Sequence, residues 1–276
     1  MPERSLDEAK IEDLWRAFLE SGTEERYRSQ RRLFRWLPTD PRCKFCNAPF
    51  HGVGSVLVRA AYGKRPSIMN PQICNVCEEF ASTHQGGAEI ELSMLFADAR
   101  GSTSIAERMS PAEFSRLINR FYKVGTGVLI RSDALVDKLI GDQVTGLYVP
   151  GIAGPDHARM AVEAAKELLQ ATGHTDPAGP WIPLGAAVHT GIAFVGSVGS
   201  KDGLTDITAL GDAPNTAARI ASQAAIGEIL VSQKAARAAK MDTGGLERRQ
   251  LELKGREQPV MVCVLGVVAE AEARRS

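Results

Sequence analysis

Apolar residues in the first part of the chain recur at the spacing of a helix. They are Ile11, Leu14, Trp15, Phe18 and Leu19. Steps of three and four positions place such residues on one face of a helix. The pattern therefore predicts helices over residues 6–37, with an interruption at Ser21-Gly22-Thr23.

From Glu89 onward, apolar runs of strand length alternate with Ala-rich segments of helical period. The predicted elements are a strand at 90–97, a helix at 111–130, a hairpin of strands at 134–140 and 143–149, a helix at 155–172, and strands at 184–190 and 193–197. Ser110, Pro111 and Glu113 form a capping box at the start of the first helix. This order predicts an α+β fold, a ferredoxin-like βαββαβ sheet with its helices on one face.

Composition and charge exclude several classes of protein. The 276 residues are 44% hydrophobic, and 33 basic residues balance 33 acidic ones. A net charge of zero provides no general attraction to nucleic acid or acidic lipid, so we expect no nucleic-acid partner. No apolar run approaches the roughly 20 residues that span a bilayer, and the first ten residues lack a signal-peptide core. We therefore expect a cytoplasmic protein without a membrane partner.

A change of composition predicts a domain boundary in the polar, Gly-containing segment 82–87. The paired cysteines precede this segment, and the alternating strands and helices follow it. We expect a helical segment at 1–37, a four-cysteine metal-binding module at 38–85 and a larger domain at 86–276.

A basic stretch with interspersed aromatic residues precedes the cysteines. It contains Arg26, Arg28, Arg31, Arg32, Arg35, Arg42 and Lys44 among Tyr27, Phe34 and Trp36, with Asp40 as the opposing charge. Such a stretch suits a nucleic-acid or phosphate surface, or a solvated helix face whose aromatic side chains pack inward. We favour the second interpretation.

Four of the five cysteines form two C-x-x-C pairs, Cys43 with Cys46 and Cys74 with Cys77, while Cys263 stands alone in an apolar stretch. A secreted disulfide framework would spread its cysteines along the chain. Two pairs at ligand spacing indicate instead one metal site, because each pair can present two thiolates from a tight turn. Prolines and glycines around the pairs predict a small knuckle-and-hairpin module that the metal stabilises.

The metal at the four cysteines is zinc or an iron-sulfur cluster. The spacing is similar to that of a zinc ribbon and favours zinc, but the segment between the pairs is long enough to hold a cluster. Zinc would be structural, whereas a cluster would make the module a redox or oxygen sensor. His51 and His84 are substitute ligands in principle, although isolated histidines are usually solvated.

Two carboxylates in the larger domain suit a magnesium-bound polyphosphate. Asp98 ends the first predicted strand, and the small-residue turn Gly101-Ser102-Thr103 that follows offers backbone N–H groups. Asp142 lies at the tip of the predicted hairpin. If the hairpin pairs beside the first strand, both carboxylates can ligate two ions a few ångströms apart. Either residue alone would be read as a turn residue.

A third motif supplies an amide and a guanidinium. Asp212 and Pro214 mark a helix start, which places Asn215 and Arg219 on one helical face. These two groups suit the orientation of a ribose and the binding of a phosphate. Arg219 alone would be read as a salt-bridge partner.

The larger domain resembles the catalytic domain of the class III nucleotidyl cyclases, the adenylate and guanylate cyclase family. The resemblance covers residues 89–267 and depends on five motifs in the order that the family has them. They are FADARGST, KLIGD, GAAVHTGIAFVGSVGS, DITALGDAPNTAARIAS and LKG.

The resemblance implies a role for each motif residue. Asp98 and Asp142 occupy the positions of the metal-binding carboxylates, which hold two Mg²⁺ or Mn²⁺ ions per active site. Lys138 and Thr208 occupy the positions that contact the base. The remaining implied site residues are Asn215 for the ribose, Arg219 and Lys254 for the phosphates, and Gly101, Ser102 and Thr103 for the substrate.

The resemblance also implies a homodimer with two sites at its interface. One chain supplies the carboxylates, and the other supplies the base, ribose and arginine contacts. The reaction is attack of the ribose 3′-oxygen on the α-phosphorus, with pyrophosphate leaving.

The expected substrate is ATP, because Lys138 can donate to an acceptor on adenine where guanylate cyclases typically have Glu. Thr208 replaces the Asp of the best-known adenylate cyclases, as in a bacterial-type subgroup, and this leaves other nucleotides open. The alternatives are a cyclase that acts on GTP or another nucleotide, and a catalytically silent nucleotide-binding or redox-sensing module. We also expect the N-terminal metal module to regulate the larger domain.

Overall fold

A computed structural model describes residues 6–21, 25–37, 41–199, 205–256 and 258–266. The chain divides into two compact units, each assembled from separate stretches of sequence. Unit 1 comprises Met1–Ile90, Val149–Gly154 and Ala193–Leu210, and unit 2 comprises Glu91–Tyr148, Pro155–Ile192 and Gly211–Ser276. Strands β1 (Gly86–Ala99) and β4 (Leu184–Gly199) have residues in both units.

Unit 2 is built on a sheet with the strand order β2-β3-β1-β4-β6-β8-β7. Its first elements along the chain are β1, α5 (Ser102–Glu107), α6 (Pro111–Arg131), β2 (Leu135–Ile140), β3 (Gln143–Tyr148), α8 (His157–Ala171) and β4. Apart from the short α5, this is the predicted βαββαβ order. The ferredoxin-like α+β prediction is confirmed.

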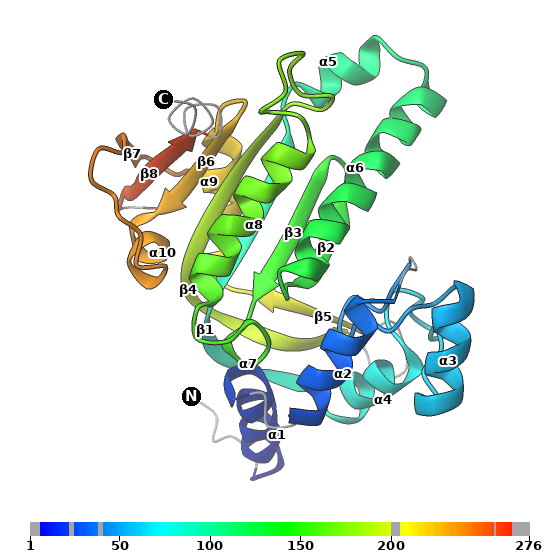
Figure 1. Cartoon of the computed structure of the whole chain (residues 1–276). Coiled ribbons are helices and arrows are strands. Elements are labelled where there is room, and N and C mark those ends of the chain that lie inside the picture. Colours follow the sequence, from blue (N-terminus) through cyan, green and yellow to red (C-terminus); the bar gives the residue numbers. More distant parts are fainter. Residues whose placement is uncertain (1–5, 22–24, 38–40, 200–204, 257, 267–276) are drawn as a thin grey trace. The chain divides into compact units, whose positions relative to one another are not determined.

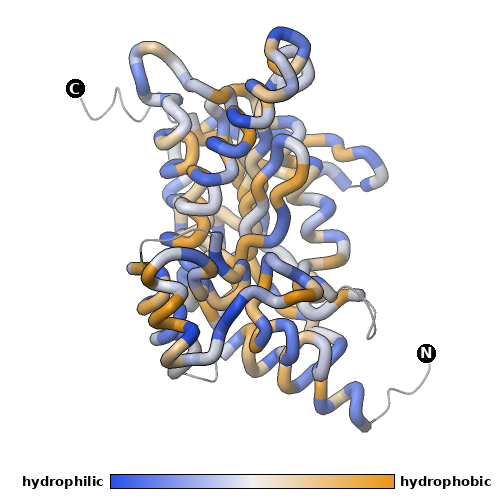
Figure 2. Tube along the Cα trace, turned by 90° about the vertical axis from the view of Figure 1, so that its right-hand side faces the viewer, coloured by the Kyte–Doolittle hydropathy of each residue, from blue (hydrophilic) through white to orange (hydrophobic). Residues whose placement is uncertain are grey.

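Helices α6 and α8 pack side by side on the sheet, α6 over β2 and β3 and α8 over β3 (Figure 1). Phe121 and Leu129 of α6 and Leu168 of α8 are fully buried, and polar residues alternate with apolar ones along the helices (Figure 2). The predicted capping box is confirmed, because Glu113 N donates to Ser110 Oγ (3.3 Å) and Ser110 N donates to Glu113 Oε2 (2.9 Å).

The rest of unit 2 extends the sheet beyond the predicted strands. The added elements are α9 (Asp212–Gln223), β6 (Glu228–Ser232), α10 (Gln233–Ala238), β7 (Arg248–Leu251) and β8 (Val260–Gly266). Strand β6 is parallel to β4, and β8 pairs antiparallel with both β6 and β7.

One strand prediction is wrong, because the two strands expected at 184–190 and 193–197 are the single strand β4. Gly191 lies between the two expected strands, within β4. A Cβ on Gly191 would lie 2.9 Å from Ala213 Cβ, so this glycine lets α9 approach the strand.

Unit 1 contains the N-terminal helices and the cysteine pairs. Its elements are α1 (Leu6–Arg16), the π-helix η1 (Ala17–Ser21), α2 (Glu25–Arg35), α3 (Gly52–Tyr62), α4 (Asn75–Thr83), α7 (Pro150–Ala153) and β5 (Thr205–Leu210). The predicted helices in 6–37 are confirmed, and Trp15, Leu19 and Phe34 are fully buried. Gly22 and Thr23 of the expected interruption lie outside the described residues.

The basic stretch before the cysteines is partly internal. Arg28 Nε donates to Gly151 O (2.7 Å), Arg31 donates to Phe45 O, and Arg42 Nη1 donates to Phe34 O (2.6 Å). Several of these guanidinium groups therefore satisfy carbonyl oxygens of the folded chain. The inward packing expected of the aromatic residues holds for Phe34 but not for Trp36, which is 77% exposed.

The hairpin expected between the cysteine pairs is wrong, because helix α3 occupies that segment. The glycines of this segment, which favoured a hairpin in the sequence, have other roles in the structure. Gly63, with φ 65°, ends the helix as a left-handed cap, and Gly54 is buried inside the helix against Leu37.

The segment 82–87 joins α4 to β1 through His84 and Gln85. A Cβ on Gly87 would lie 2.4 Å from Val195 O, and one on Gly196 would lie 2.2 Å from Gly86 O. Both glycines therefore permit a close approach of two backbones. None of the helices in the described ranges is long and apolar enough to cross a membrane.

Candidate active site and four-cysteine site

Asp98 and Asp142 are brought together by the pairing of β1 with β3. Asp98 is the register partner of Gln143, and Ala99 N donates to Asp142 O (3.0 Å). Gly141, with φ 62°, forms the tight turn between β2 and β3, and Tyr122 Oη donates to its carbonyl oxygen (2.7 Å). The turn that carries Asp142 is therefore fixed from α6 as well as from β1.

The environment of Asp98 disfavours its ionised form. Burial and, after it, the nearby Asp142 carboxylate raise the pKa of Asp98 to about 6. Its side chain is 25% exposed, so the pair is open to solvent on one side. Two carboxylates held together at an accessible edge suit divalent cations, which relieve their mutual repulsion.

Arg100 is a neighbour of this pair that the sequence reasoning did not single out. Its Nη1 lies 3.5 Å from Asp98 Oδ2, which partly opposes the rise in the pKa of Asp98. The guanidinium also donates to Ala221 O, and Arg100 N donates to Pro183 O (2.8 Å). Arg100 stands inside the motif FADARGST with Asp98, but its partners Pro183 and Ala221 lie far along the chain.

The turn after β1 begins helix α5. Gly101, with φ 68°, precedes the first helical residue Ser102, and Thr103 follows it. The first N–H groups of a helix have no partner within the helix. The local structure therefore agrees with the expectation that backbone N–H donors follow Asp98 in the chain.

The other predicted site residues of unit 2 lie on two elements and one loop. Lys138 is exposed on β2, where the pairing with β3 shifts register between Val136 and Leu139. Asn215 and Arg219 lie on α9, which begins at Asp212 as expected. Lys254 is exposed in the loop between β7 and β8.

This loop is held against α9. The guanidinium of Arg219 lies beside Gly255, since a Cβ there would be 3.6 Å from Arg219 Nη1. Arg256, also missed in the sequence, donates to Thr216 Oγ1 (2.5 Å) and pairs with Asp212. The structure therefore brings Arg219 next to Lys254-Gly255, which places two predicted phosphate contacts in one region.

Thr208 lies on β5 in unit 1. Its side chain is 6% exposed, and its Oγ1 has no hydrogen-bond partner among the described residues. A buried hydroxyl without a partner is costly unless a ligand or another chain satisfies it. This observation agrees with a binding role for the hydroxyl.

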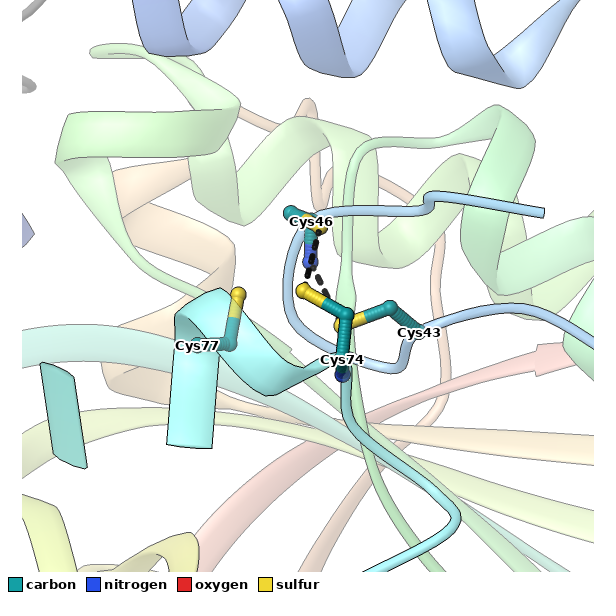
Figure 3. A group of neighbouring side chains, drawn as sticks. All are labelled: Cys43, Cys46, Cys74 and Cys77. Carbon is teal, nitrogen blue, oxygen red and sulfur yellow. Dashed lines mark hydrogen bonds between the residues drawn. The ribbon is translucent and has the colours of Figure 1, made fainter. Parts of the chain in front are cut away.

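The four paired cysteines of unit 1 converge (Figure 3). Cys43 and Cys46 come from the loop before α3, Cys74 precedes α4 and Cys77 lies in its first turn. Their sulfur atoms all lie within 4.8 Å of one another, and all four residues are buried. His51 and His84 do not belong to this group.

The surroundings of the four thiols differ: burial raises the pKa of Cys43, and hydrogen bonds with the other cysteines raise the pKa of Cys77. Cys46 N and Cys74 N both donate to Cys43 Sγ, at 3.5 and 3.3 Å. Lys64 Nζ lies 3.5 Å from Cys46 Sγ. Hydrogen bonds from the other cysteines, followed by the charge of Lys64, hold the pKa of Cys46 well below its ordinary value.

The sulfur spacing distinguishes a single ion from a cluster. Cys46 Sγ and Cys74 Sγ are 3.7 Å apart. Ligands at about 2.3 Å from one tetrahedral zinc ion are separated by about 3.8 Å. A cubane cluster holds its sulfurs farther apart because each thiolate binds a different iron. The residues present therefore fit a single ion.

The comparisons with known proteins agree with the fold and the motifs. Residues 87–266, nearly two thirds of the chain, match the family described as the adenylate and guanylate cyclase catalytic domain. The chain belongs to this family, and its larger domain is a class III nucleotidyl cyclase domain.

Curated relatives include an adenylate cyclase of Mycobacterium tuberculosis, 30% identical over 169 residues, which are 60% of this chain and 37% of the relative. An adenylate cyclase of Anabaena cylindrica is 32% identical over 161 residues, which are 56% of this chain and 30% of the relative. This chain thus matches about a third of the length of these relatives.

Similar solved structures include both kinds of cyclase. The guanylyl cyclase Cya2 is 26% identical and has a TM-score of 0.59, covering 65% of this chain and 93% of its own. The adenylyl cyclase CyaB from P. aeruginosa is 23% identical with a TM-score of 0.56, covering 64% and 94%. These likenesses support the fold and leave the choice of nucleotide open.

Proposed function

We propose that the protein is an adenylate cyclase that converts ATP to 3′,5′-cyclic AMP and pyrophosphate. The observation that carries the proposal is the juxtaposition of Asp98 with Asp142 at an accessible edge of the sheet, in a chain of the cyclase family. Their mutual repulsion makes the pair a site for divalent cations.

In the proposed reaction, the ribose 3′-oxygen forms a bond to the α-phosphorus, and the bond from that phosphorus to the bridging oxygen of the β-phosphate breaks. Pyrophosphate leaves with the electron pair, and the 3′-hydroxyl proton passes to solvent. Two Mg²⁺ or Mn²⁺ ions bound at Asp98 and Asp142 would lower the pKa of the 3′-hydroxyl and neutralise charge on the phosphates. Asn215 orients the ribose, and Arg219 and Lys254 bind phosphate oxygens.

Substrate selection is assigned to Lys138 and Thr208. A Lys side chain donates to a ring acceptor of adenine, and the Thr208 hydroxyl gains a partner when a base is bound. The relatives named adenylate cyclase support ATP, whereas the likeness to a guanylyl cyclase makes GTP the competitor to be tested.

The assay uses the purified full chain with Mn²⁺ or Mg²⁺ and measures cyclic nucleotide by chromatography and mass spectrometry. ATP should give cyclic AMP at a higher kcat/KM than GTP gives cyclic GMP. A preference for GTP would make the protein a guanylate cyclase, and no product from either nucleotide would overturn the proposed activity.

We further propose that the active unit is a homodimer whose sites combine Asp98 and Asp142 of one chain with Asn215 and Arg219 of the other. Asp98→Ala and Arg219→Ala homodimers should both be nearly inactive. Mixed dimers contain one site with both defects and one intact site, so random exchange should restore about a quarter of wild-type activity.

Subunit exchange is demonstrated separately with two differently labelled wild-type preparations. If exchange occurs and the mixture of variants stays inactive, the assignment of the two residues to opposite chains is wrong.

For unit 1 we propose one zinc ion per chain, bound by Cys43, Cys46, Cys74 and Cys77. The sulfur spacing supports a single ion, and the full set of four protein ligands is typical of a structural site. Metal analysis of protein purified without chelator should give one zinc and no iron per chain. Visible absorption with bound iron and sulfide would show a cluster instead.

A further inference from the structure

Strand β5 is connected to the four-cysteine site by an ion pair. Lys44 stands between the ligand residues Cys43 and Cys46, and its side chain pairs with Asp206 of β5. The Lys44 side chain is 9% exposed and the Asp206 side chain 37% exposed, so the lysine is shielded from water while the carboxylate remains partly open to it. The fold of residues 43–46, called the cysteine knuckle below, therefore determines where the ammonium group of Lys44 lies.

The same knuckle is tied to the second cysteine pair. Lys44 N donates to Gln72 O (3.0 Å), and Cys74 N donates to Cys43 Sγ (3.3 Å). An ion bound by all four sulfurs would add a covalent-like constraint on both segments. The position of Lys44 therefore depends on the intact cysteine site.

A second contact joins the other cysteine pair to the same hairpin. Ser197 Oγ donates to Ala81 O of α4 (2.8 Å), the helix whose first turn contains Cys77. Ser197 is the register partner of Ile207 in the pairing of β4 with β5. Helix α4 also packs against β5. Both halves of the cysteine site thus hold the β4–β5 hairpin.

Strand β5 depends on these contacts because β4 is its one strand partner in the described part of the chain. Alternate residues of a strand point to the same face. Asp206 and Thr208 are two positions apart, so a shift of Asp206 also moves Thr208. The hydroxyl of Thr208 is the buried, unpartnered atom assigned above to the base.

We propose that Lys44 is a positioning residue for the nucleotide site, and that the metal-bound cysteine knuckle holds β5 in place through the Lys44–Asp206 ion pair. The effect on the reaction rests on the proposed function, but the effect on β5 does not. Breaking the pair should weaken substrate binding without disabling the chemistry, because Asp98 lies on β1 and Asp142 lies in the turn between β2 and β3.

The first experiment compares Lys44→Ala, Lys44→Arg and Lys166→Ala in the full chain. Lys44→Ala should raise the KM for ATP about three- to tenfold and leave kcat within about twofold. Lys44→Arg should restore most of the KM, because it retains the charge. Lys166→Ala removes a lysine that pairs with Glu163 on α8 and should leave KM unchanged.

The second experiment measures hydrogen exchange at the backbone amides of β5, with β6 of unit 2 as the internal reference. Exchange in β5 should be faster in Lys44→Ala, in Asp206→Asn and in wild-type protein stripped of metal under reducing conditions. Lys44→Ala should keep its metal, because all four cysteines remain. The charge swap Lys44→Asp with Asp206→Lys should restore slow exchange.

Unchanged exchange in β5 in both Lys44→Ala and Asp206→Asn overturns the proposal. Faster exchange with an unchanged KM overturns its link to the nucleotide. If Lys44→Ala loses metal, hydrogen exchange in β5 of Asp206→Asn becomes the deciding measurement, because Asp206 lies outside the cysteine knuckle. If the wild type makes no cyclic nucleotide, the proposed function fails, and the exchange measurements still test the coupling.

Discussion

The carboxylates of unit 2 and the thiols of unit 1 are both ionisable groups held close together, but their surroundings differ. Asp98 is partly open to solvent and has one guanidinium nearby, and its pKa is raised. The four thiols are buried, Cys43 Sγ receives two backbone N–H donors, and Lys64 lies beside Cys46 Sγ. A metal ion in the first arrangement would keep coordination positions for a substrate, whereas an ion in the second would be enclosed by protein ligands. A catalytic and a structural metal site can thus be distinguished by exposure and by the number of ligands.

The largest effect should appear in the cyclase activity, when one carboxylate is removed from the Asp98–Asp142 pair of unit 2. Asp142→Asn should lower cyclase activity by about a hundredfold or more, because it removes a charge that holds the metal ions. The zinc content and the thermal unfolding of the protein should stay close to wild type. Activity is measured with Mn²⁺ over a range of concentrations, and full activity in this variant would rule out a catalytic role for Asp142.

Removal of one ligand from the four-cysteine site of unit 1 should lower the stability of the protein. Cys77→Ser should lose the bound metal and destabilise unit 1 by about 2 to 4 kcal/mol, because the metal-binding energy contributes to folding. Metal analysis and denaturant unfolding provide the measurement. Cys263→Ala is the matched control, since Cys263 is a buried cysteine outside the group and its variant should keep the metal. Equal metal content in Cys77→Ser and wild type would contradict the four-cysteine site.

A smaller effect is expected from substitution of Lys138, the exposed residue proposed to contact the base. Lys138→Glu should lower the ratio of kcat/KM for ATP to that for GTP by about tenfold, because a carboxylate replaces a donor and opposes the adenine acceptor. The two nucleotides are compared in the same preparation. An unaltered ratio would remove Lys138 from substrate selection.

The smallest effect concerns the burial of Asp98 and, after it, the repulsion by Asp142 in the absence of divalent ions. Since the folded-state pKa of Asp98 is about 6 and its ordinary value is 3.8, folding disfavours ionised Asp98, and stability is lost as the pH rises between these values. Asp98→Asn should therefore stabilise the protein by about 1 to 2 kcal/mol at pH 8, a figure reduced for solvent screening. The gain should vanish near pH 4, where Asp98 is protonated in the folded state.

Denaturant unfolding at both pH values, in buffer free of magnesium and of chelator, measures this difference. An equal gain at pH 4 and pH 8 would assign the effect to packing rather than to charge. No such gain is expected at the thiol site, because the ion proposed there would stay bound in this buffer.

The sequence by itself determined the elements with a strong local period and the residues with a recognisable motif. Helix α6 begins at its capping box, the βαββαβ order is as predicted, and the four cysteines converge as their spacing indicates. The local pattern predicts the wrong element where a glycine is needed for close packing against a residue elsewhere in the fold. Two separate strands were expected on either side of Gly191, which lies within β4, and a hairpin was expected around Gly54, which lies within helix α3.

The tertiary structure alone decided which charged side chains surround the two sites. Arg100 reaches Ala221, Lys64 reaches Cys46, and Lys44 pairs with Asp206. No spacing along the chain marks such pairs, because long side chains meet wherever the folded backbone brings their ends together. Burial then makes these contacts matter, since an ammonium or guanidinium group removed from water requires a partner, and only the packed chain determines which partner is within reach.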